Sequence, residues 1–274
     1  MRIMKLSVYT LIFSERSLEE SAQVIAELGY DGIEIRIHTD GVHIPIDYQP
    51  EYVRKIKKYI EDLGLEVSAL ASYVKLGVVE EEWVVNRKMA LKVAEVAEIL
   101  EAPYFRVQAA GYSSERGYEG IRKAFRKQAI DLAKELKKRA LQAMPILEQH
   151  GGGCIASSAG IIIDLIRGLE PTIIGVLYDP GNAVWEGWEP PRVQVDILKE
   201  YIKHVHVKNY EHDPNNPRKY VPAPLDSGIL DWREVVLLLK GIGFRGYLSI
   251  EDFRRIPPEE KAKEAIKFLK PLVK

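Results

Sequence analysis

The chain has 274 residues, of which 46% are hydrophobic and 29% are charged, a balance typical of a globular protein with a sizeable core. Its 39 lysines and arginines against 40 aspartates and glutamates give a net charge of -1, which excludes a strong overall attraction to nucleic acid or to an anionic membrane. No segment approaches the roughly 18 apolar residues needed to cross a membrane. With one cysteine, Cys154, and no secretory signal pattern, we expect a soluble, cytoplasmic protein. Abundant lysine and glutamate with sparse cysteine and methionine are typical of a thermophile.

Strand-like and helix-like patterns alternate along the chain. The apolar run 5–13 predicts a first strand, and Ser17 with Glu20 forms a capping-box pattern that predicts a helix ending near Leu28. The later strands are predicted at 31–38, 65–72, 104–109, 144–148, 172–179, 204–208 and 246–251, and the later helices at 51–63, 81–100, 118–140, 158–169, 193–203, from 231 onward, and 258–269. Eight strands alternating with eight helices, without a linker, predict a single (β/α)8 TIM barrel over residues 1–274.

The second predicted strand alternates in a way that favours a barrel over an open sheet. Its isoleucines face one side, while Glu34, Arg36 and His38 face the other. Such a polar face would be costly to bury under helices, but it can line the interior of a barrel near the mouth.

Four neighbouring strands end in residues that can bind a metal. Glu148, Asp179, His206 and Glu251 lie at or near the ends of the fifth to eighth strands. In a barrel these ends meet on one face, where three carboxylates would repel one another unless a cation neutralises them. Three oxygen ligands and one imidazole suit Mn2+, Mg2+, Co2+ or Zn2+, with Mn2+ preferred here. The alternative is that each residue serves locally, for example Asp179 by starting a turn.

Several motifs together resemble the sugar phosphate isomerase/epimerase family of xylose-isomerase-like barrels, and they cover most of the chain. They are the segments 28–34 (LGYDGIE), 179–182 (DPGN), 204–209 (HVHVKN), 228–232 (GILDW) and 243–251 (GFRGYLSIE). The resemblance implies one divalent ion held by Glu, Asp, His and Glu from strands five to eight, and Asp179, His206 and Glu251 match those positions directly. The fifth-strand ligand depends on register. If His150 and the glycine after it precede that strand, the position falls on Ser157.

We choose Glu148 for this position because it lies 31 positions before Asp179, enough for a loop, a helix and a strand, whereas Ser157 lies only 22 positions before it. The resemblance further implies that Glu148 and Glu251 are also the proton-transfer pair of a sugar or sugar phosphate isomerase or epimerase that works through an enediolate. Lys208 is expected either to contact a substrate oxygen or to form an ion pair within the barrel.

Two further residues, Asn182 and His38, are named as substrate contacts. Asn182 stands where many relatives carry a substrate-binding histidine, and we name it as a substrate contact. His38 is a weaker substrate contact, because it can equally be a packed polar residue. Trp185 and Trp188 are expected to wall the sugar or to pack.

Other functions remain open at this stage. A metal-dependent dehydratase of the inosose type would use the same barrel and metal. An apurinic-site endonuclease would need three metals and a basic groove, which six histidines and a net charge of -1 disfavour. A non-catalytic sugar-binding protein would need no metal. We therefore expect a small-molecule sugar as the partner, no nucleic acid and no membrane, and a homodimer or homotetramer.

Overall fold

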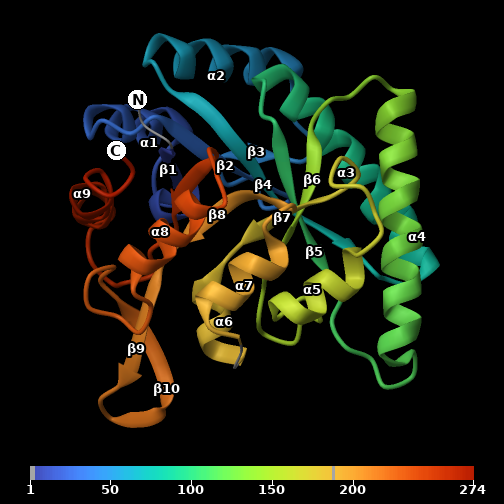
Figure 1. The fold of residues 1–274 in the computed structure, drawn as a ribbon. Helices are drawn as coiled ribbons and strands as arrows, with labels where there is room; N and C mark the ends of the chain where they lie inside the picture. The colour runs from blue at the N-terminus through green and yellow to red at the C-terminus, as the bar shows by residue number, and fades with distance from the viewer. Residues whose placement is uncertain (1–3, 187–188) are drawn as a thin grey trace.

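The computed structural model describes residues 4–186 and 189–274, and within these ranges eight parallel strands close into a barrel (Figure 1). β1 pairs with β2 on one side and with β11 on the other, which closes the ring. The ring consists of β1 (Lys5–Tyr9), β2 (Gly32–His38), β4 (Glu66–Leu76), β5 (Tyr104–Ala109), β6 (Met144–Glu148), β7 (Gly175–Tyr178), β8 (Ile202–Val207) and β11 (Tyr247–Ile250). The predicted (β/α)8 barrel is confirmed.

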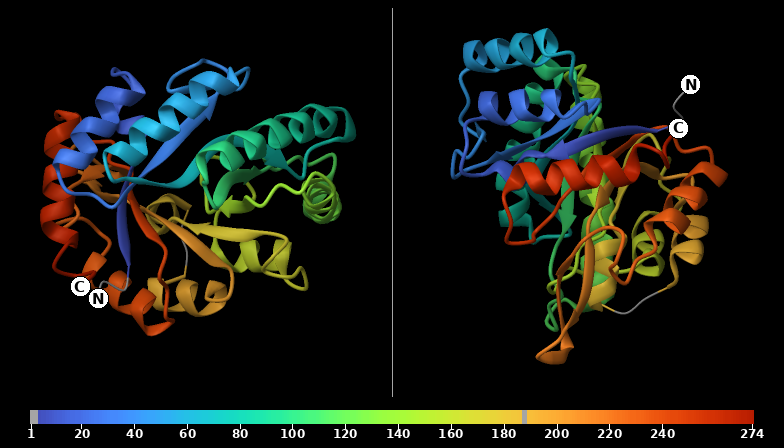
Figure 2. Two further views of the ribbon diagram at one scale, coloured as in Figure 1. Left: turned by 90° about the horizontal axis from the view of Figure 1, so that it is seen from above. Right: turned by 90° about the vertical axis from the view of Figure 1, so that its left-hand side faces the viewer.

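Helices surround the barrel, as the view from above shows (Figure 2). In the described ranges they are α1 (Leu18–Glu27), α2 (Pro50–Asp62), α3 (Glu80–Leu100), α4 (Gly117–Lys138), α5 (Ala159–Ile166), α6 (Pro180–Glu186), α7 (Pro191–Leu198), α8 (Trp232–Gly241) and α9 (Pro258–Leu269). The capping box at the start of α1 forms as predicted, because the Ser17 side chain accepts from the Glu20 amide and the Glu20 carboxylate accepts from the Ser17 amide. No described helix is long and apolar enough to cross a membrane.

Apolar and polar residues of the strands separate onto the two sides of the barrel wall. Ile33, Ile35 and Ile37 of β2 are fully buried in the hydrophobic core. Between them, Glu34 reaches two histidines of β8, although β1 and β11 separate β2 from β8 in the ring. Such a contact is feasible only through the barrel interior, so the inward polar face predicted for this strand is confirmed.

The structure differs from the predicted elements at several connections. The first strand ends at Tyr9 and continues as a 3-10 helix, η1 (Thr10–Phe13). A two-residue strand, β3 (Ile44–Pro45), extends the sheet beside β2. An unexpected helix, α6, begins directly after Asp179. The polar segment after the seventh barrel strand forms an antiparallel hairpin, β9 (Asn209–Asp213) and β10 (Asn216–Ala223), which projects from the barrel (Figures 1 and 2).

Candidate metal centre

The four predicted ligands meet at the C-terminal ends of adjacent strands. Glu148 is the last residue of β6, Asp179 and Glu251 directly follow β7 and β11, and His206 lies near the end of β8. The Nδ1 atom of His206 is 3.4 Å from Glu148 Oε1, 3.5 Å from Asp179 Oδ2 and 3.5 Å from Glu251 Oε2. All four side chains are buried. Four strands far apart in sequence therefore direct three carboxylates toward one imidazole nitrogen.

The donor atoms of this group have the chemistry and spacing that a divalent cation requires. Two ligand atoms each about 2.1 Å from one cation lie about 3.0–3.4 Å apart in octahedral or tetrahedral geometry. The separations from His206 Nδ1 to the three carboxylates are close to this range. The same nitrogen is buried and has no hydrogen-bond partner among the described residues. An unpartnered imidazole nitrogen facing carboxylates fits a ligand atom, since a purely structural histidine normally satisfies both nitrogens.

Two of the carboxylates, Glu148 and Asp179, are held in the ionised form in which they can bind a cation. Burial raises the pKa of Glu148, but the charge of Arg106 and the contact with His206 outweigh it, so the pKa lies well below its ordinary value. Burial likewise raises the pKa of Asp179, and the Lys208 ammonium reverses the shift, so this pKa is also lowered. Both groups are therefore charged at neutral pH.

Lys208 lies inside the carboxylate group rather than apart from it. Its Nζ is 2.7 Å from Asp179 Oδ2 and 2.5 Å from Glu251 Oε2. Burial lowers the pKa of Lys208, but the charges of Asp179 and Glu251 raise it by a larger amount. The pKa therefore lies above its ordinary value and the side chain stays charged. Gly181 makes room for it, because a Cβ there would lie 2.5 Å from Lys208 Cγ. The ion pair expected for this lysine within the barrel is present.

The other predicted substrate contacts lie in different surroundings. Asn182 donates from Nδ2 to Asp179 Oδ2 and to the Gln149 carbonyl, so its amide holds a candidate ligand in place. His38 lies at the mouth, with its ring centroid 4.5 Å from that of Tyr73.

Of the two tryptophans expected to wall the sugar or to pack, only Trp185 lies among the described residues. Trp185 is 48% exposed and packs edge-on against Tyr210 and Tyr220 of the hairpin, at centroid distances of 5.2 Å and 5.6 Å. Trp188 lies outside the described residues. Trp185 therefore packs against the hairpin, as one of its two expected roles requires.

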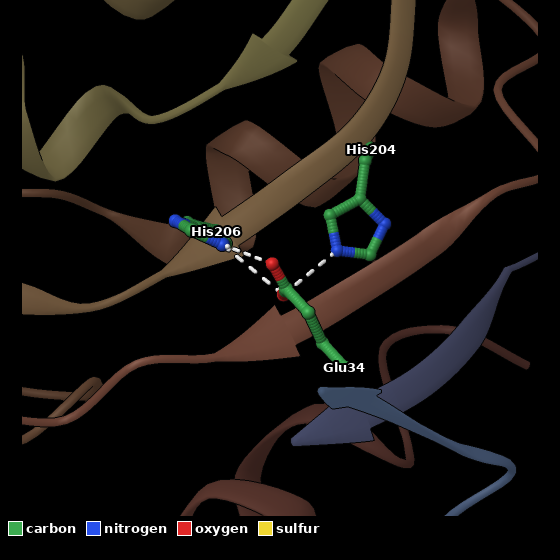
Figure 3. Close-up of side chains that lie close together, drawn as sticks. All are labelled: Glu34, His204 and His206. Atoms are coloured by element: carbon green, nitrogen blue, oxygen red, sulfur yellow. Dashed lines mark hydrogen bonds and ion pairs between the residues drawn. The ribbon is translucent and has the colours of Figure 1, made fainter. Parts of the chain in front are cut away.

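A buried carboxylate that sequence reasoning did not assign to the site bridges two histidines. Figure 3 shows Glu34 between His204 and His206, with the second nitrogen of His206 on the side of its ring away from Glu34. The Glu34 oxygens lie 3.0 Å and 3.1 Å from His206 Nε2, and one of them lies 3.0 Å from His204 Nε2. All three side chains are fully buried. These three residues could also hold an ion by spacing, but their mutual hydrogen bonds already satisfy the facing atoms.

Glu148 has its own partners on the neighbouring strand β5. Arg106 Nη1 lies 3.3 Å from Glu148 Oε1, and Gln108 Nε2 donates to Glu148 Oε2 at 3.0 Å. Arg106 is also buried and donates from Nε to the Ser72 carbonyl. The available sequence signal was the alternation of Arg106 and Gln108 with apolar residues in this strand, which indicates an inward polar face.

The fold and this centre define the class of protein: an α/β barrel with a buried group of carboxylates and a histidine at its catalytic face. The family model described as "Xylose isomerase-like TIM barrel" matches residues 22–272, so the chain belongs to that family. It is similar to an inosose dehydratase of Clostridium tetani (strain Massachusetts / E88), at 29% identity over 162 residues, covering 51% of this chain and 53% of that protein. The match thus spans about half the length of the curated relative.

Solved structures resemble the chain over almost its whole length. A 3-keto-D-glucoside 4-epimerase from E. coli superposes with a TM-score of 0.77 at 17% identity, covering 98% of this chain and 99% of that one. A xylose isomerase-like TIM barrel protein from Mycobacterium smegmatis in complex with magnesium has the same TM-score and identity, covering 98% and 97%. At these identities the similarity shows the fold alone.

Proposed function

We propose that the protein is a divalent-metal-dependent isomerase or epimerase of a sugar or sugar phosphate. The observation that carries this proposal concerns the buried Nδ1 of His206. It has no hydrogen-bond partner in the described part of the chain, and it faces oxygens of Glu148, Asp179 and Glu251 at 3.4–3.5 Å. A divalent cation there, with Mn2+ preferred, would polarise a substrate carbonyl and acidify the adjacent C–H bond. The magnesium complex of a structural relative is consistent with a cation in this fold.

The protein's own residues would then move the proton. Glu148 and Glu251 come from β6 and β11, which lie on either side of the β7–β8 pair in the ring, so they can approach a substrate carbon from two directions. One carboxylate would remove the carbon-bound proton to give an enediolate, and the other would return a proton. Return to the opposite face of the same carbon gives an epimer, and return to the neighbouring carbon gives an isomer. Lys208, which contacts Asp179 and Glu251, would supply a hydrogen bond to a substrate oxygen.

A second candidate function is dehydration of a cyclic polyol ketone. The observation that favours it is that the curated protein described above is an inosose dehydratase. Dehydration begins with the same removal of a proton beside a carbonyl, and it differs in the next step, where a hydroxyl leaves from the neighbouring carbon. The same metal and the same base would therefore serve both reactions.

The test is a panel of ketoses, aldoses and inososes, assayed with Mn2+ and again after chelation. We expect turnover that chelation abolishes and Mn2+ restores. Glu148→Gln and Glu251→Gln should each lower the rate by about 10²–10⁴-fold, the usual contribution of a general acid or base. Glu66→Gln is a matched control, because that carboxylate pairs with Lys5 and Tyr247 at the opposite end of the barrel. Full activity in either site variant would refute the two-carboxylate mechanism.

A further inference from the structure

A second group of polar side chains lies beside the candidate metal centre, on the barrel wall formed by β1, β2, β4 and β5. It consists of Tyr9, Arg36, Tyr73 and Arg106. Tyr73 lies where the pairing of β4 with β5 shifts register, between Leu70 and Val74. Register shifts of this kind redirect a side chain and are frequent next to active sites.

Tyr73 is the member of this group that is accessible from outside. Its side chain is half-buried, whereas Tyr9, Arg36 and Arg106 are buried. The arginines are also largely committed to other partners. Arg36 makes two hydrogen bonds to Asp40 in addition to its contact with Tyr73, and Arg106 pairs with Glu148. Both guanidinium groups thus have carboxylate partners, and both also contact the phenol of Tyr73, which lies between them.

The contacts of Tyr73 stabilise its ionised form. Arg36 Nε donates to the Tyr73 oxygen at 3.2 Å, and the Tyr9 hydroxyl lies 3.4 Å from it. The Arg106 guanidinium lies 4.6 Å from the centre of the Tyr73 ring. Burial raises the pKa of Tyr73, but the charge of Arg106, the two hydrogen bonds and the charge of Arg36 outweigh it, so the pKa is below its ordinary value.

The pKa of Tyr9 is shifted in the opposite direction to that of Tyr73. It is fully buried, and burial raises its pKa well above the ordinary value. Tyr9 therefore keeps its proton and can donate a hydrogen bond to an ionised Tyr73. The pair thus has one accessible phenol that releases its proton and one buried phenol that supports the resulting phenolate.

Arg106 links this phenol to Glu148, one of the two proposed proton-transfer carboxylates. Its Nη1 lies 3.3 Å from Glu148 Oε1, while its guanidinium covers the Tyr73 ring. The remaining nitrogen, Nη2, is buried and finds no hydrogen-bond partner among the described residues. Glu148 and Tyr73 therefore contact the same guanidinium group, whose Nη2 donor has no partner among the described residues. A substrate bound at Glu148 would therefore lie near the guanidinium group that Tyr73 also contacts.

We propose that Tyr73 is a further catalytic residue, the acid that protonates a departing hydroxyl group, so that the site dehydrates a polyol ketone. This inference rests on the proposed carbon–hydrogen chemistry of the site and extends it to elimination. One of the two glutamates takes the proton from the carbon beside the carbonyl, and that electron pair forms the new C=C bond. The C–O bond on the neighbouring carbon breaks, and the hydroxyl leaves with the Tyr73 proton as water. Solvent then returns a proton to the phenolate and takes one from the glutamic acid, so the net reaction is substrate to product plus water.

Tyr73→Phe separates the two halves of this reaction. With an inosose and Mn2+ in D2O, the first step is measured as exchange of the carbon-bound proton and the second as release of the unsaturated product. We expect Tyr73→Phe to slow elimination by about 10²–10⁴-fold while exchange stays within about threefold of the unmodified protein. Tyr112→Phe, at an exposed tyrosine, is the matched control and should change neither rate. An equal loss of both steps, or no loss of elimination, would overturn the proposal.

Arg36→Met provides an independent readout that a merely structural role would not move. Elimination needs protonated Tyr73, so its rate falls as pH rises through the pKa of that phenol. Loss of the Arg36 charge and hydrogen bond should raise this pKa. The fall in elimination rate on the alkaline side of the pH–rate profile should therefore move to higher pH. The other groups that contact Tyr73 are Tyr9, Arg106 and His38, and this variant leaves them in place. An unmoved alkaline side of this profile would overturn the proposal.

The unmodified protein separates failure of this inference from failure of the proposed function. Proton exchange without elimination of any inosose would overturn the role of Tyr73 and leave the isomerase or epimerase proposal standing. Absence of both exchange and elimination with the whole panel would overturn both proposals.

Discussion

Replacement of Glu34 by glutamine should weaken cation binding, although Glu34 is not itself one of the candidate ligands. A carboxylate only accepts hydrogen bonds, and the Glu34 oxygens lie 3.0–3.1 Å from Nε2 of both His204 and His206. Burial raises the pKa of Glu34, but the two histidines lower it well below its ordinary value, so it is ionised. Each histidine must therefore carry a proton on Nε2. Burial lowers the pKa of His206, but Glu34 and Glu251 raise it above its ordinary value, so a cation would bind Nδ1 in place of a proton while Nε2 keeps its own.

The glutamine side chain would supply one acceptor and one donor to the same two histidines. Its NH2 group would face an Nε2–H, and one histidine would have to move its proton to Nδ1. When His206 does so, the nitrogen that faces the three carboxylates can no longer bind a cation. Loss of a partner behind a metal-binding histidine typically costs about 10–100-fold in affinity, which is about 1.4–2.8 kcal/mol.

The assay is a titration with Mn2+, followed by calorimetry or by the paramagnetic signal of the free ion. Glu34→Gln should bind Mn2+ about 10–100-fold more weakly, whereas the control Glu66→Gln, at the other end of the barrel, should match the unmodified protein. Circular dichroism verifies that both variants are folded. A folded Glu34→Gln protein with unchanged Mn2+ affinity would refute the tautomer argument.

Two further predictions concern stability. Lys208→Met leaves Asp179 and Glu251 buried without their cation, so the free energy of unfolding in chelator should fall by about 3–5 kcal/mol. Saturating Mn2+ should restore more stability to this variant than to the unmodified protein in urea titrations, and an equal Mn2+ effect would contradict the prediction. His43 is buried, which lowers its pKa from 6.5 to about 4, so the unfolded chain binds more protons between these values and stability should fall by about 3 kcal/mol as pH drops from 6.5 to 4. His43→Asn, which suits the positive φ of 69° at this position, should flatten that part of the stability–pH curve, and an unchanged slope would argue against His43 as its source.

The order of strands and helices follows from local signals in the sequence. Alternation in the second strand, the capping box at Ser17 and the apolar runs that end in an acid each depend on residues near one another in the chain. Once eight such units close into a parallel barrel, the strand ends must share one face, so the sequence was enough to bring together Glu148, Asp179, His206 and Glu251. The choice of Glu148 over Ser157 depended on the same spacing, and Glu148 is the residue that ends β6.

Contacts across the barrel were decided only by the tertiary structure. Alternation shows that Glu34 faces inward, but it cannot show that the residue meets His204 and His206, about 170 positions away. The same holds for Tyr73, whose direction depends on a register shift between β4 and β5. The unexpected helix α6 turns Asn182 back onto Asp179. Periodicity fixes the side of a strand on which a residue lies, whereas its partner across the interior depends on register, closure and side-chain length together.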